Sequence, residues 1–187
     1  MEIKIGEGKL IKYHLPSYNL TIHISEKYMY YPRRSELEAF LAKLKPVKLP
    51  KVEKGNITFH NVTVVPKAEG LSAFGTFRIE ETIIDYEYAD IKCELKPVDS
   101  PLLEGINDII KPHIPPEKAV RELKDDEIMG INAVQPKHTV SPTICFCDSR
   151  KRYYVGIMRG HWSNWVGQKF QVLEKEDGII TKIRYYP

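Results

Sequence analysis

The segment at residues 145–165, CFCDSRKRYYVGIMRGHWSNW, combines basic and aromatic side chains with two thiols and a histidine. No acidic residue occurs between Asp148 and Glu174, so neighbours in sequence do not balance its cations. Because cations neutralise phosphate groups and flat rings stack on unpaired bases, this composition favours contact with single-stranded nucleic acid or RNA. The side chains that we predict to form this surface are Arg150, Lys151, Arg152, Tyr153, Tyr154, Arg159, His161 and Trp162.

We expect a division of roles within this predicted surface. Its arginines and Lys151 contact phosphate, while Trp162 and one of the two adjacent tyrosines stack on bases. A second aromatic–basic segment, YMYYPRR at 28–34, has the same character. The alternative interpretation is structural, since tryptophans commonly anchor cores and a basic run is often a solvated turn.

The same region contains residue types that zinc prefers as ligands. Cys145 and Cys147 share one face if their segment is a strand, and His138 and His161 lie nearby in the sequence. Structural zinc sites usually use a C-x2-C spacing and a second ligand pair, whereas this sequence has C-x-C and no second cysteine pair. We therefore predict no metal site and interpret the two cysteines as small apolar residues on the inner face of a strand.

The segment 74–96, FGTFRIEETIIDYEYADIKCELK, alternates in the manner of a β-hairpin. A two-residue turn at 89–90 would place Asp85 opposite Glu94, with Lys96 on the same face. Two carboxylates can hold Mg²⁺, and a lysine can position the attacking water or stabilise the developing charge. The arrangement resembles the core of the PD-(D/E)xK nucleases, in which an acid on one strand precedes E-x-K on the next. The resemblance implies a Mg²⁺-dependent nuclease with these three side chains as catalytic candidates; the other interpretation is the polar face of an amphipathic hairpin.

The elements that would position these side chains are strands, then helices, then strands again. Alternating apolar residues predict strands in the first third and in the last third of the chain, where Asp177-Gly178 predicts a hairpin turn. SELEAFLAKLK at 35–45 has apolar residues at helical spacing, and PPEKAVRELK at 115–124 predicts a second helix with proline in its first turn. We therefore predict an α+β fold with a mostly antiparallel sheet or a partly closed barrel and two or three helices.

Prolines concentrate in residues 97–118, which contain five of them. We predict a single α+β domain over residues 1–187, with 97–118 as the place where a subdivision would fall. Within this stretch SPLLEGINDIIKP has a helix-like apolar stripe, which favours a helical crossover as the alternative.

Composition limits the class of protein. A chain of 187 residues that is 42% hydrophobic can bury a core, and a net charge of +3 means that nucleic-acid binding must come from local patches. Three cysteines do not make a disulfide framework and fit a reducing compartment, and the first residues lack the apolar segment of a secretion signal. We therefore expect a cytoplasmic protein without a membrane span, and its Lys, Glu, Ile, Tyr and Pro content favours a thermophile.

Three functional hypotheses follow from these patterns. We favour an accessory nucleic-acid-binding protein with DNA or RNA as partner, and the sequence leaves open whether the chain is an enzyme. The alternatives are the nuclease described above and a structural or assembly protein that forms a homo-oligomer through exposed tyrosines and tryptophans. The sequence has no glycine-rich phosphate loop, serine-nucleophile signature or H-E-x-x-H motif, and we predict no cofactor.

Overall fold

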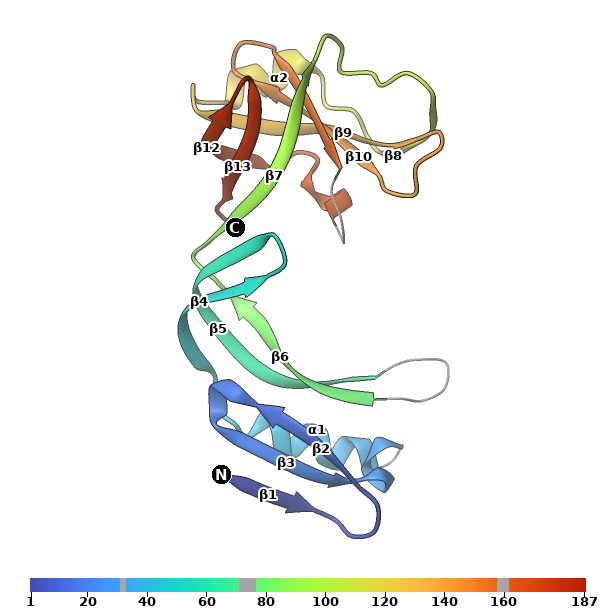
Figure 1. The fold of residues 1–187 in the computed structure, drawn as a ribbon, viewed down its shortest axis with the longest axis vertical. Helices are drawn as coiled ribbons and strands as arrows, with labels where there is room; N and C mark the ends of the chain where they lie inside the picture. Colours follow the sequence, from blue (N-terminus) through green and yellow to red (C-terminus); the bar gives the residue numbers. More distant parts are fainter. Residues whose placement is uncertain (31–32, 71–76, 158–161) are drawn as a thin grey trace. The chain divides into compact units, whose positions relative to one another are not determined.

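The computed structural model describes residues 1–30, 33–70, 77–157 and 162–187. Strands predominate and most of their pairings are antiparallel (Figure 1). The described residues form two α-helices, α1 (Arg33–Ala42) and α2 (Pro116–Glu122). These features confirm the predicted mostly antiparallel α+β architecture, and both predicted helices are present.

The chain divides into two compact units. The N-terminal unit comprises residues 1–52 and 60–87, and the C-terminal unit comprises residues 53–59 and 88–187. The proline-rich segment 97–118 therefore lies wholly within the C-terminal unit, and the chain crosses between the units elsewhere. The number of independently folding domains stays a prediction.

The N-terminal unit begins with a three-stranded sheet. Its strands are β1 (Glu2–Ile5), β2 (Leu10–Leu15) and β3 (Leu20–Ser25), and β3 lies in the middle, parallel to β1 and antiparallel to β2. The 3-10 helices η1 (Pro16–Tyr18) and η2 (Glu26–Met29) flank β3. Helix α1 buries Leu37 and Leu41 against apolar residues of β3, such as Ile22, because these two leucines lie one helical turn apart on one face.

Three further strands follow in the sequence: β4 (Val47–Lys54), β5 (Ile57–Gly70) and β6 (Phe77–Asp85). Strand β6 pairs with β5, and this register places Asp85 opposite Thr63. The hairpin predicted for 74–96 is therefore wrong. Residues 89–90, its predicted turn, lie inside the next strand, β7 (Tyr88–Val98), where both are buried.

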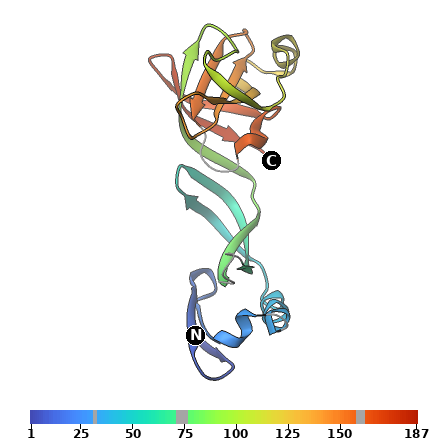
Figure 2. The same ribbon diagram turned by 90° about the vertical axis from the view of Figure 1, so that its right-hand side faces the viewer.

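Six strands of the C-terminal unit form a closed ring of antiparallel pairs (Figures 1 and 2). Strand β7 pairs with β13, with β5 and, near its end, with β11, and the pairing with β11 closes the ring. In order around the ring the strands are β7, β11 (Tyr153–Ile157), β10 (Thr143–Asp148), β9 (Glu127–Pro136), β12 (Lys169–Glu176) and β13 (Ile179–Tyr185). As predicted, Asp177-Gly178 forms the turn between β12 and β13.

Strand β8 (Ile106–Lys111) pairs with β9 beside the ring. The helical crossover considered for this stretch is therefore wrong at 106–111. The apolar residues of this stretch are spaced as in a helix, but its backbone is paired with β9, with Ile109 opposite Val134. Pairing with a strand outside the local sequence therefore determines the conformation here, rather than the local spacing of apolar residues.

Both faces of β10 are covered, and all six of its residues are buried. Phe146 contacts Phe170 of β12 with 5.7 Å between ring centroids, and because β9 lies between these two strands the contact crosses the interior of the ring. Trp165, at the end of η3 (Trp162–Trp165), packs on Phe170 at 4.8 Å. Gly130 of β9 allows this packing, since a Cβ atom there would collide with the carbonyl oxygen of Trp165.

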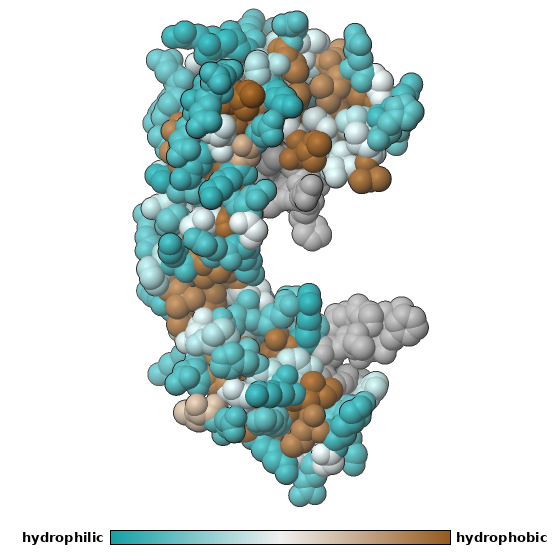
Figure 3. Space-filling model, viewed as in Figure 1, coloured by the Kyte–Doolittle hydropathy of each residue, from teal (hydrophilic) through white to brown (hydrophobic). Residues whose placement is uncertain are grey.

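The surface of the chain is mostly polar on the face shown in Figure 3, with scattered apolar patches. In the C-terminal unit the exposed large apolar side chains include Ile109, Val140 and Ile157. Within the described residues, no helix has both the length and the apolar character needed to cross a membrane.

Candidate nucleic-acid interface

The turn between β10 and β11 carries three of the predicted phosphate-binding residues. Asp148, the last residue of β10, uses its Oδ1 atom to accept hydrogen bonds from the backbone N–H groups of Arg150 and Arg152, both at 2.9 Å. The N–H of Asp148 donates to the carbonyl oxygen of Arg152 at 3.0 Å. Lys151 has a φ of 60°, the left-handed conformation that short hairpin loops often contain. The carboxylate therefore fixes the turn that presents the three cations.

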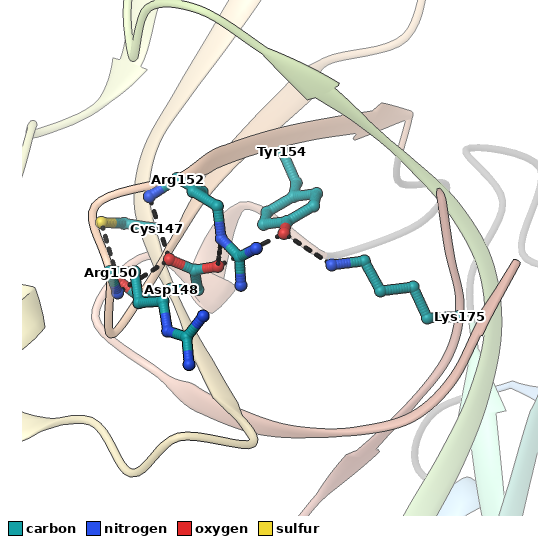
Figure 4. Close-up of polar contacts among 6 residues, drawn as sticks. All are labelled: Cys147, Asp148, Arg150, Arg152, Tyr154 and Lys175. Atoms are coloured by element: carbon teal, nitrogen blue, oxygen red, sulfur yellow. Dashed lines mark hydrogen bonds and ion pairs between the residues drawn. The ribbon is translucent and has the colours of Figure 1, made fainter. Parts of the chain in front are cut away.

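A chain of polar contacts continues from Asp148 across the end of the ring (Figure 4). Its Oδ2 atom accepts hydrogen bonds from Nε of Arg152 at 2.8 Å and from the hydroxyl of Tyr154 at 3.3 Å. Nζ of Lys175, on β12, donates to the same hydroxyl at 2.9 Å and lies 5.0 Å from the centroid of the Tyr154 ring. The hydroxyl thus donates once and accepts once, which agrees with its single proton.

Asp148 is ionised and buried within this network. Its side chain is 8% exposed, whereas that of Arg152 is 56% exposed. Burial acts to raise the pKa of Asp148, but the backbone N–H groups of Arg152 and Arg150 and the Arg152 guanidinium outweigh burial and lower the pKa below its ordinary value. The negative charge of Asp148 is therefore neutralised by hydrogen bonds within the protein, while the guanidinium of Arg152 that pairs with it remains accessible to solvent.

An open hollow with a volume of about 420 Å³ lies beside this network, and we call it the basic hollow. Its lining comes from the end of β7, the 148–152 turn, the start of β11, the end of β12 and the β12–β13 turn. The lining residues are Pro97, Val98, Asp99, Lys151, Arg152, Tyr153, Tyr154, Lys175 and Gly178. Three of them are cations and one is an acid.

Closure of the ring explains why these residues meet. The β7–β11 pairing sets Tyr153 opposite Val98 and Tyr154 opposite Pro97. Lys175 reaches Tyr154 because β12 and β13 complete the ring on the other side of β7. The hollow therefore depends on contacts between distant parts of the chain, because its lining extends from Pro97 to Gly178, and the local sequence contains only some of its residues.

The two adjacent tyrosines have different surroundings. Tyr154 is 3% exposed, so burial excludes it as a base-stacking residue and leaves it a supporting role beneath the cations. Tyr153 is half-buried, packs against the apolar cluster under α2, and also lines the basic hollow. Of the two, Tyr153 is the residue that a ligand can reach.

The three cations of the turn also differ. Arg152 is held by Asp148, and Nζ of Lys151 lies 3.5 Å from Oε1 of Glu117 in a pair whose members are both exposed. The side chain of Arg150 is exposed, and Figure 4 draws no contact between its guanidinium and the other residues shown. The charges on this surface are therefore partly balanced within the protein.

The remaining residues of the predicted surface give less information. Arg159 and His161 lie outside the residues that the structure describes. Trp162 is the first residue of η3, and its side chain also lies outside the described part. In the second aromatic–basic segment, 28–34, Tyr31 lies outside the described residues as well.

The two cysteines considered as zinc ligands lie in an apolar cluster. Cys145 and Cys147 are fully buried and pack with Ala119 of α2 and with Met129 on the outer face of the ring. Burial raises the pKa of Cys145 to about 12 and that of Cys147 to about 11, which disfavours the thiolate that binds zinc. His138 is exposed in the β9–β10 connection. Among the described residues no group of three or more potential ligands could hold a metal ion.

The three candidate nuclease residues do not share a hairpin. Asp85 ends β6 in the N-terminal unit, while Glu94 and Lys96 lie on β7 in the C-terminal unit. Nζ of Lys96 is 3.4 Å from Oε1 of Glu94, and both side chains are more than 60% exposed. The predicted juxtaposition depended on a β6–β7 hairpin. Strand β6 pairs with β5, and β7 pairs with β5, β11 and β13, so the predicted hairpin beneath the resemblance is wrong.

Sequence reasoning missed three residues of this region: Asp148, Lys175 and Asp99. An aspartate that ends a strand immediately before S-R-K-R is typical of a residue that caps a turn, so a local signal for Asp148 was present. No local signal marks the other two, because the ring brings them to the turn from β12 and β7.

Comparison of the chain with protein-family models, with curated proteins and with solved structures finds no match.

Proposed function

We propose that the C-terminal unit binds single-stranded nucleic acid or RNA through the basic hollow, as an accessory rather than a catalytic protein. The observation that carries the proposal is that Lys151, Arg152 and Lys175 line one open hollow together with Tyr153. Cations at this density attract a phosphate backbone, and an accessible tyrosine provides a stacking surface for one base.

Each cation has a distinct part in this proposal. Lys175 is held by the hydroxyl of Tyr154, and among the described residues no carboxylate forms an ion pair with it, so a phosphate would be its first direct ionic partner. Arg152 is fixed by Asp148 through Nε, which orients the rest of the guanidinium without occupying it. Arg150 extends the same surface beyond the hollow.

We further propose that the closed ring of six strands behaves as a partly closed barrel that supports this surface. Closure leaves few free strand edges and gathers loops at the ends, where ligands of small barrels commonly bind. The position of the hollow at the end of β7 and beside two hairpin turns agrees with this arrangement.

The experiment is a salt titration of binding to a fluorescently labelled oligouridylate of about 12 nucleotides, followed by anisotropy. We compare the wild-type chain with Lys175→Gln and with a matched control, Lys169→Gln, which removes the same charge from the opposite end of β12. We do not use Arg152 variants, because Arg152 also satisfies the buried carboxylate of Asp148.

We expect Lys175→Gln to weaken binding about 3- to 10-fold at low salt and to reduce the slope of log K against log salt by about 0.7, the value for one phosphate contact on a single strand. Lys169→Gln should leave both quantities close to those of the wild type. Equal losses in the two variants would mean that net charge alone attracts the strand. No binding by the wild type at low salt would refute the proposed function.

The homo-oligomer considered above stays a prediction. Sedimentation of the purified chain at several concentrations tests it directly, because a reversible oligomer sediments faster as its concentration rises.

A further inference from the structure

Asp99 is the one acid in the lining of the basic hollow. It follows Val98, the last residue of β7, and Val98 lies opposite Tyr153 of β11. One more step along this antiparallel register brings Asp99 opposite Arg152. Aspartate and arginine in directly opposed positions are well placed to form a cross-strand ion pair.

This expected pair is not formed. Arg152 turns instead to Asp148, and Lys151 pairs with Glu117. Lys175 donates to the hydroxyl of Tyr154. Within the residues that the structure describes, no ion pair joins Asp99 to any of these three cations.

The side chain of Asp99 is exposed, so its carboxylate can accept hydrogen bonds from a ligand. A hollow for a simple anion would be weakened by this negative charge, because like charges repel. The combination of three cations with one accessible carboxylate suits a ligand that has an anionic group and a hydrogen-bond donor a short distance apart. A ribonucleotide in a strand has both, a phosphate and a 2′-hydroxyl, whereas a deoxyribonucleotide lacks the hydroxyl.

We propose that the basic hollow selects RNA over DNA, with Asp99 accepting a hydrogen bond from the 2′-hydroxyl of a ribonucleotide whose phosphate lies against Lys175 and Arg152. This inference rests on the proposed function and names its ligand. The volume of about 420 Å³ suits one nucleotide unit of the strand, since pockets for small ligands begin at about 300 Å³.

The test measures the affinities of one labelled oligouridylate and of the oligodeoxyuridylate of the same length, so that the probes differ only in the 2′-hydroxyl. The variants are Asp99→Ala, which removes the acceptor and the charge, and Asp99→Asn, which removes the charge but keeps an amide oxygen. The matched control is Asp108→Ala, which removes an exposed carboxylate from β8 in the same unit, outside the lining of the hollow.

We expect the wild type to bind the RNA probe about 5- to 10-fold more tightly than the DNA probe, which lies within the range for one hydrogen bond formed in place of a contact with water. Asp99→Ala should bring the two affinities together, Asp99→Asn should keep part of the preference, and Asp108→Ala should keep all of it. If both Asp99 variants strengthen binding to both probes by one factor, Asp99 acts only through its charge and the inference is wrong, although the proposed function stands. If the wild type binds neither probe, the proposed function itself is wrong.

Discussion

Arg34 and Arg152 each pair with a carboxylate four residues away in the sequence, and the two pairs have nearly the same length. Nε of Arg34 lies 2.9 Å from Glu38 on α1, and Nε of Arg152 lies 2.8 Å from Asp148 in the C-terminal unit. The side chain of Glu38 is 51% exposed, whereas that of Asp148 is 8% exposed. An exposed pair competes with water and contributes little, but a buried carboxylate that loses its partners is costly.

The aromatic residues beside these pairs differ in the same way. In the N-terminal unit the guanidinium of Arg33 lies 5.6 Å from the centroid of the half-buried Tyr28 ring. In the C-terminal unit Tyr154 is buried and joins Asp148 to Lys175. Two segments of similar composition therefore have different roles, an ordinary helix surface in one and a supported hollow in the other.

The largest effect should come from Asp148→Ala. Removing the carboxylate leaves two backbone N–H groups and the Tyr154 hydroxyl without an acceptor, and we expect the free energy of unfolding of the C-terminal unit to fall by about 2–4 kcal/mol. Both tryptophans belong to this unit, so tryptophan fluorescence during urea denaturation reports on it alone. A loss of stability below about 0.5 kcal/mol, the size expected of an exposed ion pair, would show that the buried pair contributes no more than the exposed one.

The second prediction concerns pH. The folded-state pKa of Asp148 lies below its ordinary value of 3.8, so folding favours the ionised form. Its contribution is therefore complete above about pH 5 and is lost as the pH falls below about 4 toward the lowered pKa. We compare the wild type with Asp148→Asn by denaturation at several pH values, and we expect the difference in stability to shrink as the pH falls below about 4. A difference that is constant from pH 6 to about pH 2.5 would show that the charge of Asp148 contributes nothing.

The third prediction separates the two segments as binding surfaces. Arg150→Gln should weaken binding to an oligouridylate about threefold, because an exposed arginine beside the basic hollow loses one phosphate contact. The double variant Arg33→Gln with Arg34→Gln should change the affinity by less than the error of an anisotropy titration. If the Arg33 and Arg34 double variant loses more affinity than Arg150→Gln, the binding surface lies on the N-terminal unit and the proposed surface is wrong.

The smallest effect should come from Glu38→Ala. Loss of the exposed pair with Arg34 should lower stability by about 0.3–0.5 kcal/mol, the usual contribution of such a pair on a helix. Far-UV circular dichroism during denaturation measures this loss, and the tryptophan transition should not move. If Glu38→Ala lowers the free energy of unfolding as much as Asp148→Ala does, then burial of the carboxylate does not explain the difference between the two ion pairs.

Local patterns in the sequence predicted the local elements well. The helical spacing of Leu37 and Leu41 and the proline at the start of α2 both mark helices that are present, and Asp177-Gly178 forms its predicted turn. These signals act within about ten residues, so they can be read from the chain directly.

Pairing between distant strands could not be predicted in the same way. Asp90 was expected in a turn, but it lies in β7 and receives two hydrogen bonds from Arg184, at 2.6 and 3.1 Å. No residue near Asp90 in the sequence indicates that its carboxylate pairs with Arg184, which lies 94 residues away. The basic hollow was found only in part for the same reason, since its turn is local whereas Lys175 and Asp99 arrive through closure of the ring.

The most direct test of the central claim is a titration of the ¹⁵N-labelled chain with unlabelled oligouridylate, followed by the backbone amide signals in NMR spectra. The account predicts that the signals of residues 98–99, 150–154, 175 and 178 shift together and saturate at one concentration, while those of η2 and α1 do not move. Shifts centred on η2 and α1, or no shifts at low salt, would contradict it.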